Sequence, residues 1–149
     1  MRKNIRKPAV ILMAEDDPDD RLLSKEALAE ANVNYDLRFV MDGEELLDYL
    51  CSRDEYQNSE HAPRPDLILL DLNMPRKDGR EALQEIKADP QLWSIPVVVL
   101  TTSRSEEDVV RSYDLGVSGY VTKPVRFEKL VEVMKTIGKY WFEMVELPS

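Results

Sequence analysis

Short apolar runs alternate with longer amphipathic stretches along the whole chain. Most of these runs lack an apolar–polar alternation, which is typical of strands that are buried on both faces. The run at residues 35–40 is the one that alternates. The predicted strands span residues 9–14, 35–40, 66–71, 96–100 and 118–122.

The stretches between the runs repeat apolar residues at helical spacing. Pro18 suits the first turn of a helix, which Asp16 or Asp17 could cap. Ser105 and Asp108 have the spacing of a capping box at another helix start. The predicted helices span residues 18–31, 44–50, 79–88, a fourth that follows Ser105, and a long fifth from residue 127 to 141. The apolar residues expected to face inward are Leu22, Leu23, Ala27, Leu28 and Ala31 in the first helix, and Val109, Val110 and Tyr113 in the fourth.

Five strand–helix units in succession predict an α/β domain with a parallel sheet covered by helices. Right-handed crossovers then give a (βα)5 doubly wound, flavodoxin-like sheet with strand order 2-1-3-4-5. We expect one domain over residues 1–149, with a core at about 8–137 and a helical extension at 138–149. The polar segment at 52–65 is long for a loop, and whether it is a recognition element or a tolerated insertion stays open.

Composition narrows the class of protein. With 20 basic and 29 acidic residues the net charge is -9, which makes nucleic-acid binding by this chain alone unfavourable. The single cysteine, Cys51, fits a reducing compartment. The apolar run near the basic N-terminus has six residues, fewer than the roughly 7–15 of a signal peptide or the about 20 of a membrane span. We therefore expect a cytoplasmic protein without a membrane segment.

Chemistry-bearing side chains follow the predicted strands. Parallel strands bring their carboxyl ends to one edge of a sheet, where ligands bind. Clustered carboxylates prefer a compensating cation, and oxygen ligands favour Mg²⁺, for which Mn²⁺ could substitute. A lysine and a hydroxyl beside the same aspartate are parts used in phosphoryl transfer, which makes Asp71 the candidate nucleophile. The residues at these strand ends are Glu15, Asp16, Asp71, Thr101 and Lys123.

Four stretches carry a resemblance to a known family: VILMAEDDPDD, PDLILLDLNMPRKDGREALQEIK, PVVVLTTS and GYVTKPV. In this order and at these intervals, the chain resembles the receiver domains of two-component response regulators from about residue 8 to 137. The resemblance implies phosphorylation of Asp71, with Glu15 and Asp16 as the metal-binding acids. It also implies that the backbone carbonyl of Asn73 binds Mg²⁺. Glu15 departs from the usual aspartate, and its longer arm would reach the metal through water.

The resemblance implies further roles near the phosphoryl group. Thr101 matches the switch hydroxyl, Tyr120 the switch aromatic residue and Lys123 the phosphate-binding lysine. Thr102 stands where many receivers have a smaller residue, so it could restrict the hydrolytic water and change the lifetime of the phosphoryl group. The bond between Lys123 and Pro124 matches a peptide that is usually cis in the family.

Within the family, the chain looks most like the stand-alone receivers paired with bacterial phytochromes and related sensor kinases. This implies a sensor histidine kinase as the phosphodonor, with a bacterial phytochrome as the candidate. About a dozen residues follow Ile137, too few for an output domain, so we expect output through a protein partner. A homodimer through the fourth helix, the fifth strand, the fifth helix and the C-terminal tail is a further hypothesis. The apolar residues of that tail are Trp141, Phe142, Met144, Val145 and Leu147.

Other functions fit the residues less well. A phosphohydrolase with an aspartyl-phosphate intermediate characteristically has an acid two residues after the nucleophile, where this chain has Asn73. A nucleotide- or flavin-binding domain would need a glycine-rich loop after the first strand. A receiver that serves only as a scaffold would not need Asp71, Thr101 and Lys123. The acids that follow Asp16 suit the first turn of a helix better than a metal site; they are Asp17, Asp19 and Asp20.

Overall fold

The computed structural model describes residues 8–31, 35–53, 56–57 and 62–140. Its five parallel strands have the order β2-β1-β3-β4-β5, which confirms the predicted doubly wound topology. Each predicted strand lies within one residue of its observed bounds. The strands are β1 (Ala9–Ala14), β2 (Tyr35–Val40), β3 (Leu67–Leu70), β4 (Val97–Thr101) and β5 (Gly119–Thr122).

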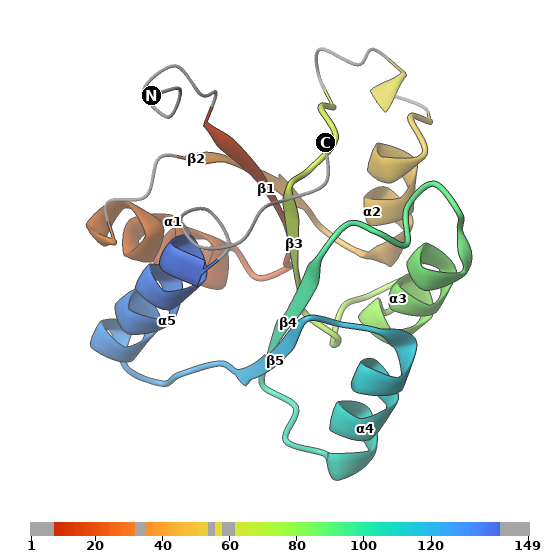
Figure 1. The fold of residues 1–149 in the computed structure, drawn as a ribbon. Helices are drawn as coiled ribbons and strands as arrows, with labels where there is room; N and C mark the ends of the chain where they lie inside the picture. Colours follow the sequence, from red (N-terminus) through yellow and green to blue (C-terminus); the bar gives the residue numbers. More distant parts are fainter. Residues whose placement is uncertain (1–7, 32–34, 54–55, 58–61, 141–149) are drawn as a thin grey trace.

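Helices cover both faces of the sheet (Figure 1). Two of them, α1 (Pro18–Glu30) and α5 (Phe127–Lys139), lie on one face. The other three, α2 (Gly43–Leu50), α3 (Gly79–Ala88) and α4 (Glu106–Leu115), lie on the opposite face. The core is correspondingly divided into two apolar clusters, one under α1 and α5 and one mainly under α2 and α3. β1 and β3 contribute to both clusters, because successive strand residues point to opposite faces.

Local hydrogen bonds explain where the helices begin. Asp17 caps α1, and its side chain accepts a hydrogen bond from Asp19 N at 2.9 Å. Ser105 caps α4 by accepting from Asp108 N at 3.3 Å. The side chain of Asp108, however, accepts from Arg80 and Ser103, so it does not complete the predicted capping box. A reciprocal capping box is present at α3 instead.

The predicted inward faces of two helices are confirmed only in part, since Ala27 and Leu28 of α1 are fully buried as expected but four other predicted residues are exposed. Leu22 and Leu23 on α1 are 54% and 41% exposed. Val110 and Tyr113 on α4 are 59% and 51% exposed. A helix buries only a narrow stripe, and the buried residues of α1 are Ser24, Ala27 and Leu28, whereas α4 buries Ser112. Each buried stripe thus contains a small serine that a pattern of apolar residues alone does not mark.

The described part of the 52–65 segment folds back on α2. The rings of Tyr49 and Tyr56 lie 5.1 Å apart, and Tyr49 Oη donates a 2.8 Å hydrogen bond to Pro63 O. Ala62 is buried in the core cluster beneath α2 and α3. Trp141 and the rest of the predicted apolar tail fall outside the described residues. Within the described part of the chain, no helix has the length and apolar character needed to span a bilayer.

Candidate functional site

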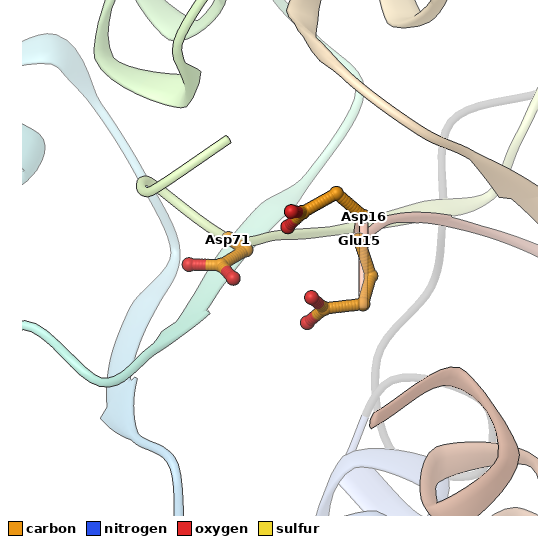
Figure 2. Close-up of side chains that lie close together, drawn as sticks. All are labelled: Glu15, Asp16 and Asp71. Atoms are coloured by element: carbon orange, nitrogen blue, oxygen red, sulfur yellow. The ribbon is translucent and has the colours of Figure 1, made fainter. Parts of the chain in front are cut away.

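Three carboxylates meet at the carboxyl edge of the sheet, as the strand-end pattern predicts. Glu15 and Asp16 follow β1 and Asp71 follows β3. Figure 2 shows Glu15 and Asp16 extending toward Asp71 from the neighbouring strand. Each residue offers one oxygen, and these oxygens all lie within 4.8 Å of one another. Glu15 and Asp71 are buried, whereas Asp16 is exposed, so the cluster opens to solvent on one side.

Backbone hydrogen bonds at the ends of the strands fix the positions of Glu15 and Asp71. Asp71 N donates to Ala14 O at 3.2 Å, which extends the pairing of β1 with β3 by one residue. Glu15 N donates to Val40 O at 3.0 Å, which does the same between β1 and β2. Glu15 and Asp71 are therefore still paired with the sheet and lie at its same edge.

The turn after β3 holds one oxygen of Asp71. Asn73 N donates to Asp71 Oδ1 at 3.1 Å, and Gly79 N closes the loop by donating to Leu72 O at 3.0 Å. A Cβ atom on Gly79 would lie 2.3 Å from Asp71 O, which is too close for any side chain. Glycine at this position lets the start of α3 approach the backbone of Asp71.

Lys123 brings the positive charge to this edge. Its Nζ atom lies 3.2 Å from Asp71 Oδ2 and 2.8 Å from Asp20 Oδ2, and it also donates to Glu15 Oε1. The Lys123 side chain is only 12% exposed. Its backbone N–H donates to Thr101 O at 2.7 Å, which fixes the turn after β5. The predicted contact of Lys123 with Asp71 is therefore present.

Burial and charge shift the pKa values of these groups. Burial raises the pKa of Glu15 to about 7, even though the hydrogen bond from Lys123 opposes this change. Burial alone would lower the pKa of Lys123, but hydrogen bonds to Asp20 and Glu15, with the charge of Asp71, raise it overall. Lys123 thus stays charged, and the raised pKa of Glu15 lies close to neutral pH.

The sequence prediction missed the role of Asp20. It treats Asp20 as a first-turn acid that complements the dipole of α1, not as a member of the site. The structure shows that Asp20 pairs with Lys123, from which it is separated by 103 positions. Side chains on a helix point back toward its N-terminus, so an acid in the first turn of α1 can reach the sheet edge. That general rule is the one sequence signal that could have indicated this contact.

Thr101 ends β4 beside Asp71. It is fully buried, and its Oγ1 donates to Asp71 Oδ1 at 2.8 Å. Thr102, the next residue, is exposed. Tyr120 is half-buried, and its Oη donates to Ser103 O at 3.1 Å. Tyr120 therefore contacts the loop that follows Thr101.

The predicted cis peptide between Lys123 and Pro124 is wrong for this structure. Among residues 8–31, 35–53, 56–57 and 62–140 no peptide bond is cis. Bonds before proline favour the trans isomer by only about 0.5–1 kcal/mol. Such a small preference lets the local surroundings select either isomer, and proline in the sequence does not determine which one forms.

The donor set fits a hard divalent cation. All three side chains offer carboxylate oxygens, the ligands preferred by Mg²⁺ and also suited to Mn²⁺. The 4.8 Å spread of these oxygens is small enough for side-chain rotation to bring them to one ion. Asn73 is exposed on the loop directly after Asp71, so its backbone lies beside the same opening.

Residues 11–135 match the family model of the response regulator receiver domain. The chain belongs to the response regulator receiver family. A curated relative, the response regulator Rcp1 of Synechocystis sp., is 46% identical over 142 residues, which cover 95% of each chain. Receivers of this family accept phosphoryl groups from histidine kinases, and this chain is a single phosphoryl-accepting receiver of that kind.

Solved receivers have the same fold. The crystal structure of the phosphorylated cyanobacterial phytochrome response regulator RcpA is 48% identical, with a TM-score of 0.88, and the match covers 95% of this chain and 99% of RcpA. The Mn²⁺-bound form of Rcp1 is 46% identical, with a TM-score of 0.86, and the match covers 95% of this chain and 100% of Rcp1.

Proposed function

We propose that Asp71 is the residue of this receiver that takes the phosphoryl group. The observation that carries the proposal is the convergence of Lys123, Thr101 and two further acids on this one carboxylate. Asp71 Oδ1 is held by Thr101 and by Asn73 N, and Oδ2 faces Lys123. A carboxylate fixed in one orientation is prepared for attack on a phosphorus atom.

In the transfer, a carboxylate oxygen of Asp71 forms a bond to the phosphorus of a kinase phosphohistidine. The P–N bond breaks, its electron pair stays on the imidazole nitrogen, and the phosphoryl group remains on Asp71 as an acyl phosphate. The new group adds a charge of about -1.5 to -2 next to Lys123. Lys123 would then exchange part of its contact with Glu15 for the phosphoryl oxygens.

The residues that would hold Mg²⁺ or Mn²⁺ are Glu15, Asp16, Asp71 and the backbone carbonyl of Asn73. When bound, the ion supplies positive charge for the phosphoryl oxygens and for the crowded carboxylates. Support comes from the clustered oxygens of three of these residues. The related receiver Rcp1 has been solved with Mn²⁺.

Phosphorylation would act as a switch through Thr101 and Tyr120. Thr101 already contacts Asp71 Oδ1 and would follow the phosphoryl oxygens. Tyr120, whose hydroxyl bonds to Ser103 O, would pack into the space that Thr101 leaves. The face formed by α4, β5 and α5 would then change between two states. Thr102, exposed beside Thr101, would limit the access of hydrolytic water.

The chain would catalyse only its own phosphorylation and dephosphorylation. Asn73 occupies the position where an aspartyl-phosphate hydrolase has its second acid, and an amide cannot transfer the proton. We further propose one domain over residues 1–149, located in the cytoplasm, with a phytochrome-type histidine kinase as phosphodonor. The phytochrome response regulator RcpA, 48% identical, supports this donor class.

A protein effector and a homodimer through the α4–β5–α5 face complete the proposal. Val110 and Tyr113 are large, exposed side chains on α4, which suits a protein contact. Sedimentation of the chain before and after phosphorylation tests the dimer. A monomer mass at every concentration in both states would contradict it.

The test of the phosphoacceptor is incubation with Mg²⁺ and acetyl phosphate, followed by intact mass. We expect a Mg²⁺-dependent gain of one phosphoryl group that is absent in Asp71→Asn. Asp66→Asn is the matched control, because Asp66 precedes β3 at the opposite edge of the sheet, where it accepts a 2.9 Å hydrogen bond from Val10 N. No adduct on a folded wild-type chain, or an undiminished adduct on Asp71→Asn, would contradict the assignment.

A further inference from the structure

An ion pair joins the first turns of α3 and α4. Arg80 Nε donates to Asp108 Oδ1 at 2.7 Å, and Arg80 Nη2 donates to Asp108 Oδ2 at 2.6 Å. Two parallel bonds between a guanidinium and a carboxylate give a fixed geometry, unlike a single contact between flexible charges. The side chain of Asp108 is 12% exposed and that of Arg80 is 37% exposed, so the pair is partly shielded from water.

Arg80 also holds the loop that follows Asp71. Its Nη2 donates to Asn73 Oδ1 at 3.3 Å, and its Nη1 donates to Leu72 O at 3.3 Å and to Asp78 Oδ2 at 3.2 Å. Asn73 is the residue whose backbone N–H donates to Asp71 Oδ1. One end of the ion pair therefore reaches the carboxylate oxygen of Asp71 through the β3–α3 loop.

Asp108 holds the loop that follows Thr101. Its Oδ2 accepts a 2.6 Å hydrogen bond from Ser103 Oγ. Ser103 N donates to Thr101 Oγ1 at 3.4 Å, and Thr101 Oγ1 donates to Asp71 Oδ1. The other end of the ion pair thus reaches the same oxygen through the β4–α4 loop. Asn73 N and Thr101 Oγ1 both donate to Asp71 Oδ1, and the Arg80–Asp108 ion pair joins the loops that contain or follow these two donors.

The ion pair between Arg126 and Glu128 has no such connection. Arg126 and Glu128 lie 3.7 Å apart, with side chains 77% and 75% exposed, and both belong to the start of α5. Exposed pairs of this kind contribute little. For Asp108, the hydrogen bond from Arg80 lowers the pKa to about 2, so its carboxylate stays charged at any physiological pH.

We propose that Arg80 and Asp108 form a clasp that positions Asp71 for phosphoryl transfer. The clasp holds Asn73 on one side and Ser103 on the other, and through them keeps Asp71 Oδ1 in place while Oδ2 faces Lys123. Arg80 and Asp108 are positioning residues, because neither touches Asp71. The proposal rests on the proposed function of Asp71 as phosphoacceptor.

A double-mutant cycle on the full chain tests the clasp. Phosphorylation rates are measured with acetyl phosphate at saturating Mg²⁺ for the wild type, Arg80→Gln, Asp108→Asn and the double variant. We expect each single variant to be slower by about fivefold or more, the size of coupling seen between contacting residues of one network. The double variant should be no slower than either single variant, because both substitutions release the same contact.

Two readouts separate positioning from simple loss of stability. Urea unfolding should show that each variant is fully folded under the assay conditions, so that a slower rate reports the position of Asp71 and not a loss of folded protein. Arg80→Lys keeps the charge but cannot form two parallel bonds, so its rate should fall between those of the wild type and Arg80→Gln. Arg80→Lys also serves as the reporter if Arg80→Gln fails to fold.

Arg38→Gln is the matched control, since it removes a salt bridge between Arg38 and Asp36 on β2, away from the site. It should phosphorylate at the wild-type rate. Wild-type rates in folded clasp variants, or single effects that multiply in the double variant, would overturn the clasp while Asp71 still accepts phosphate. A wild-type chain that is not labelled at Asp71 would overturn the proposed function and the clasp together.

Discussion

The hydroxyl of Thr101 donates a 2.8 Å hydrogen bond to Asp71 Oδ1, and both residues are buried at the ends of neighbouring strands. Ser103 N donates to the same hydroxyl oxygen, and Tyr120 Oη donates to Ser103 O. A change at Asp71 therefore has a continuous path of hydrogen bonds to β5. Phosphorylation of Asp71 would alter these bonds.

Thr101→Ala should separate phosphorylation from its structural response. We expect the Asp71 adduct to form, but hydrogen exchange in α4 and β5 should no longer change when it does. The unmodified protein should also lose about 1–3 kcal/mol of unfolding free energy, since a buried carboxylate loses one donor. Thr101→Ser, which keeps the hydroxyl, is the control. An exchange response like that of the wild type in Thr101→Ala would reject this path.

Lys123→Met should lower the free energy of unfolding, because the acids of the site then repel one another without a counter-charge. Without Lys123, Glu15 and Asp71 are buried without a counter-charge, which costs about 3 kcal/mol or more of unfolding free energy. The loss should shrink when Mg²⁺ is added, because the ion replaces the positive charge and binds the native state. Urea unfolding with and without Mg²⁺ measures both effects.

Lys87→Met is the control for that comparison. Lys87 is a partly buried lysine whose Nζ donates to the carbonyls of Trp93 and Ile95 and contacts no carboxylate of the site. Its loss should lower stability equally with and without Mg²⁺. Equal Mg²⁺ effects in Lys87→Met and Lys123→Met would refute the electrostatic account of the site.

Mg²⁺ binding should depend on pH through Glu15. Burial raises the pKa of Glu15 to about 7, and only the deprotonated carboxylate binds a metal ion. The apparent Mg²⁺ affinity should therefore rise from about pH 5.5 and level off above the pKa of Glu15. Calorimetric titrations across this range test the prediction. Glu15→Gln should bind Mg²⁺ more weakly and with a flatter pH dependence, and an equally steep profile would count against Glu15.

Gly79→Ala should damage the site through the backbone. A Cβ atom there would lie 2.3 Å from Asp71 O and 2.7 Å from Leu72 Cα, so α3 and the end of β3 must separate. We expect a loss of about 1–3 kcal/mol in urea unfolding, typical of overpacking, together with slower phosphorylation. Gly119→Ala is the control, because its Cβ would meet only Val98 methyl groups at 3.8 Å. Equal effects of the two substitutions would contradict the close approach.

Acid should release Asp108 from Arg80. The hydrogen bond from Arg80 lowers the pKa of Asp108 from 3.8 to about 2. A depressed pKa in the folded state means that the stabilisation is complete above the unfolded value and is lost as the pH falls through the folded value. The difference in unfolding free energy between wild type and Asp108→Asn should be constant near neutral pH and shrink from about pH 4 to 2. A constant difference down to the lowest pH would contradict this.

Much of the fold follows from local patterns in the sequence. Continuous apolar runs such as Leu67–Leu70 are buried on both faces, so they predict a parallel sheet without knowledge of any partner. The residues directly after the strands, among them Asp71 and Thr101, could be placed at one edge because parallel strands share a direction. The buried faces of α1 and α4 were predicted only in part: Ala27 and Leu28 are buried as expected, but Ser24 and Ser112 also face the core, while large apolar residues such as Leu22 and Val110 face solvent.

The sequence by itself determined the order of strands and helices and the acids at the strand ends, because hydrophobic periodicity and chain direction are local properties. Only the tertiary structure decided that Asp20 pairs with Lys123 and that Arg80 pairs with Asp108. Each of these contacts joins side chains far apart along the chain, from different elements. Such contacts depend on how the elements pack against one another, and side-chain directions across that packing cannot be obtained from spacing along the chain.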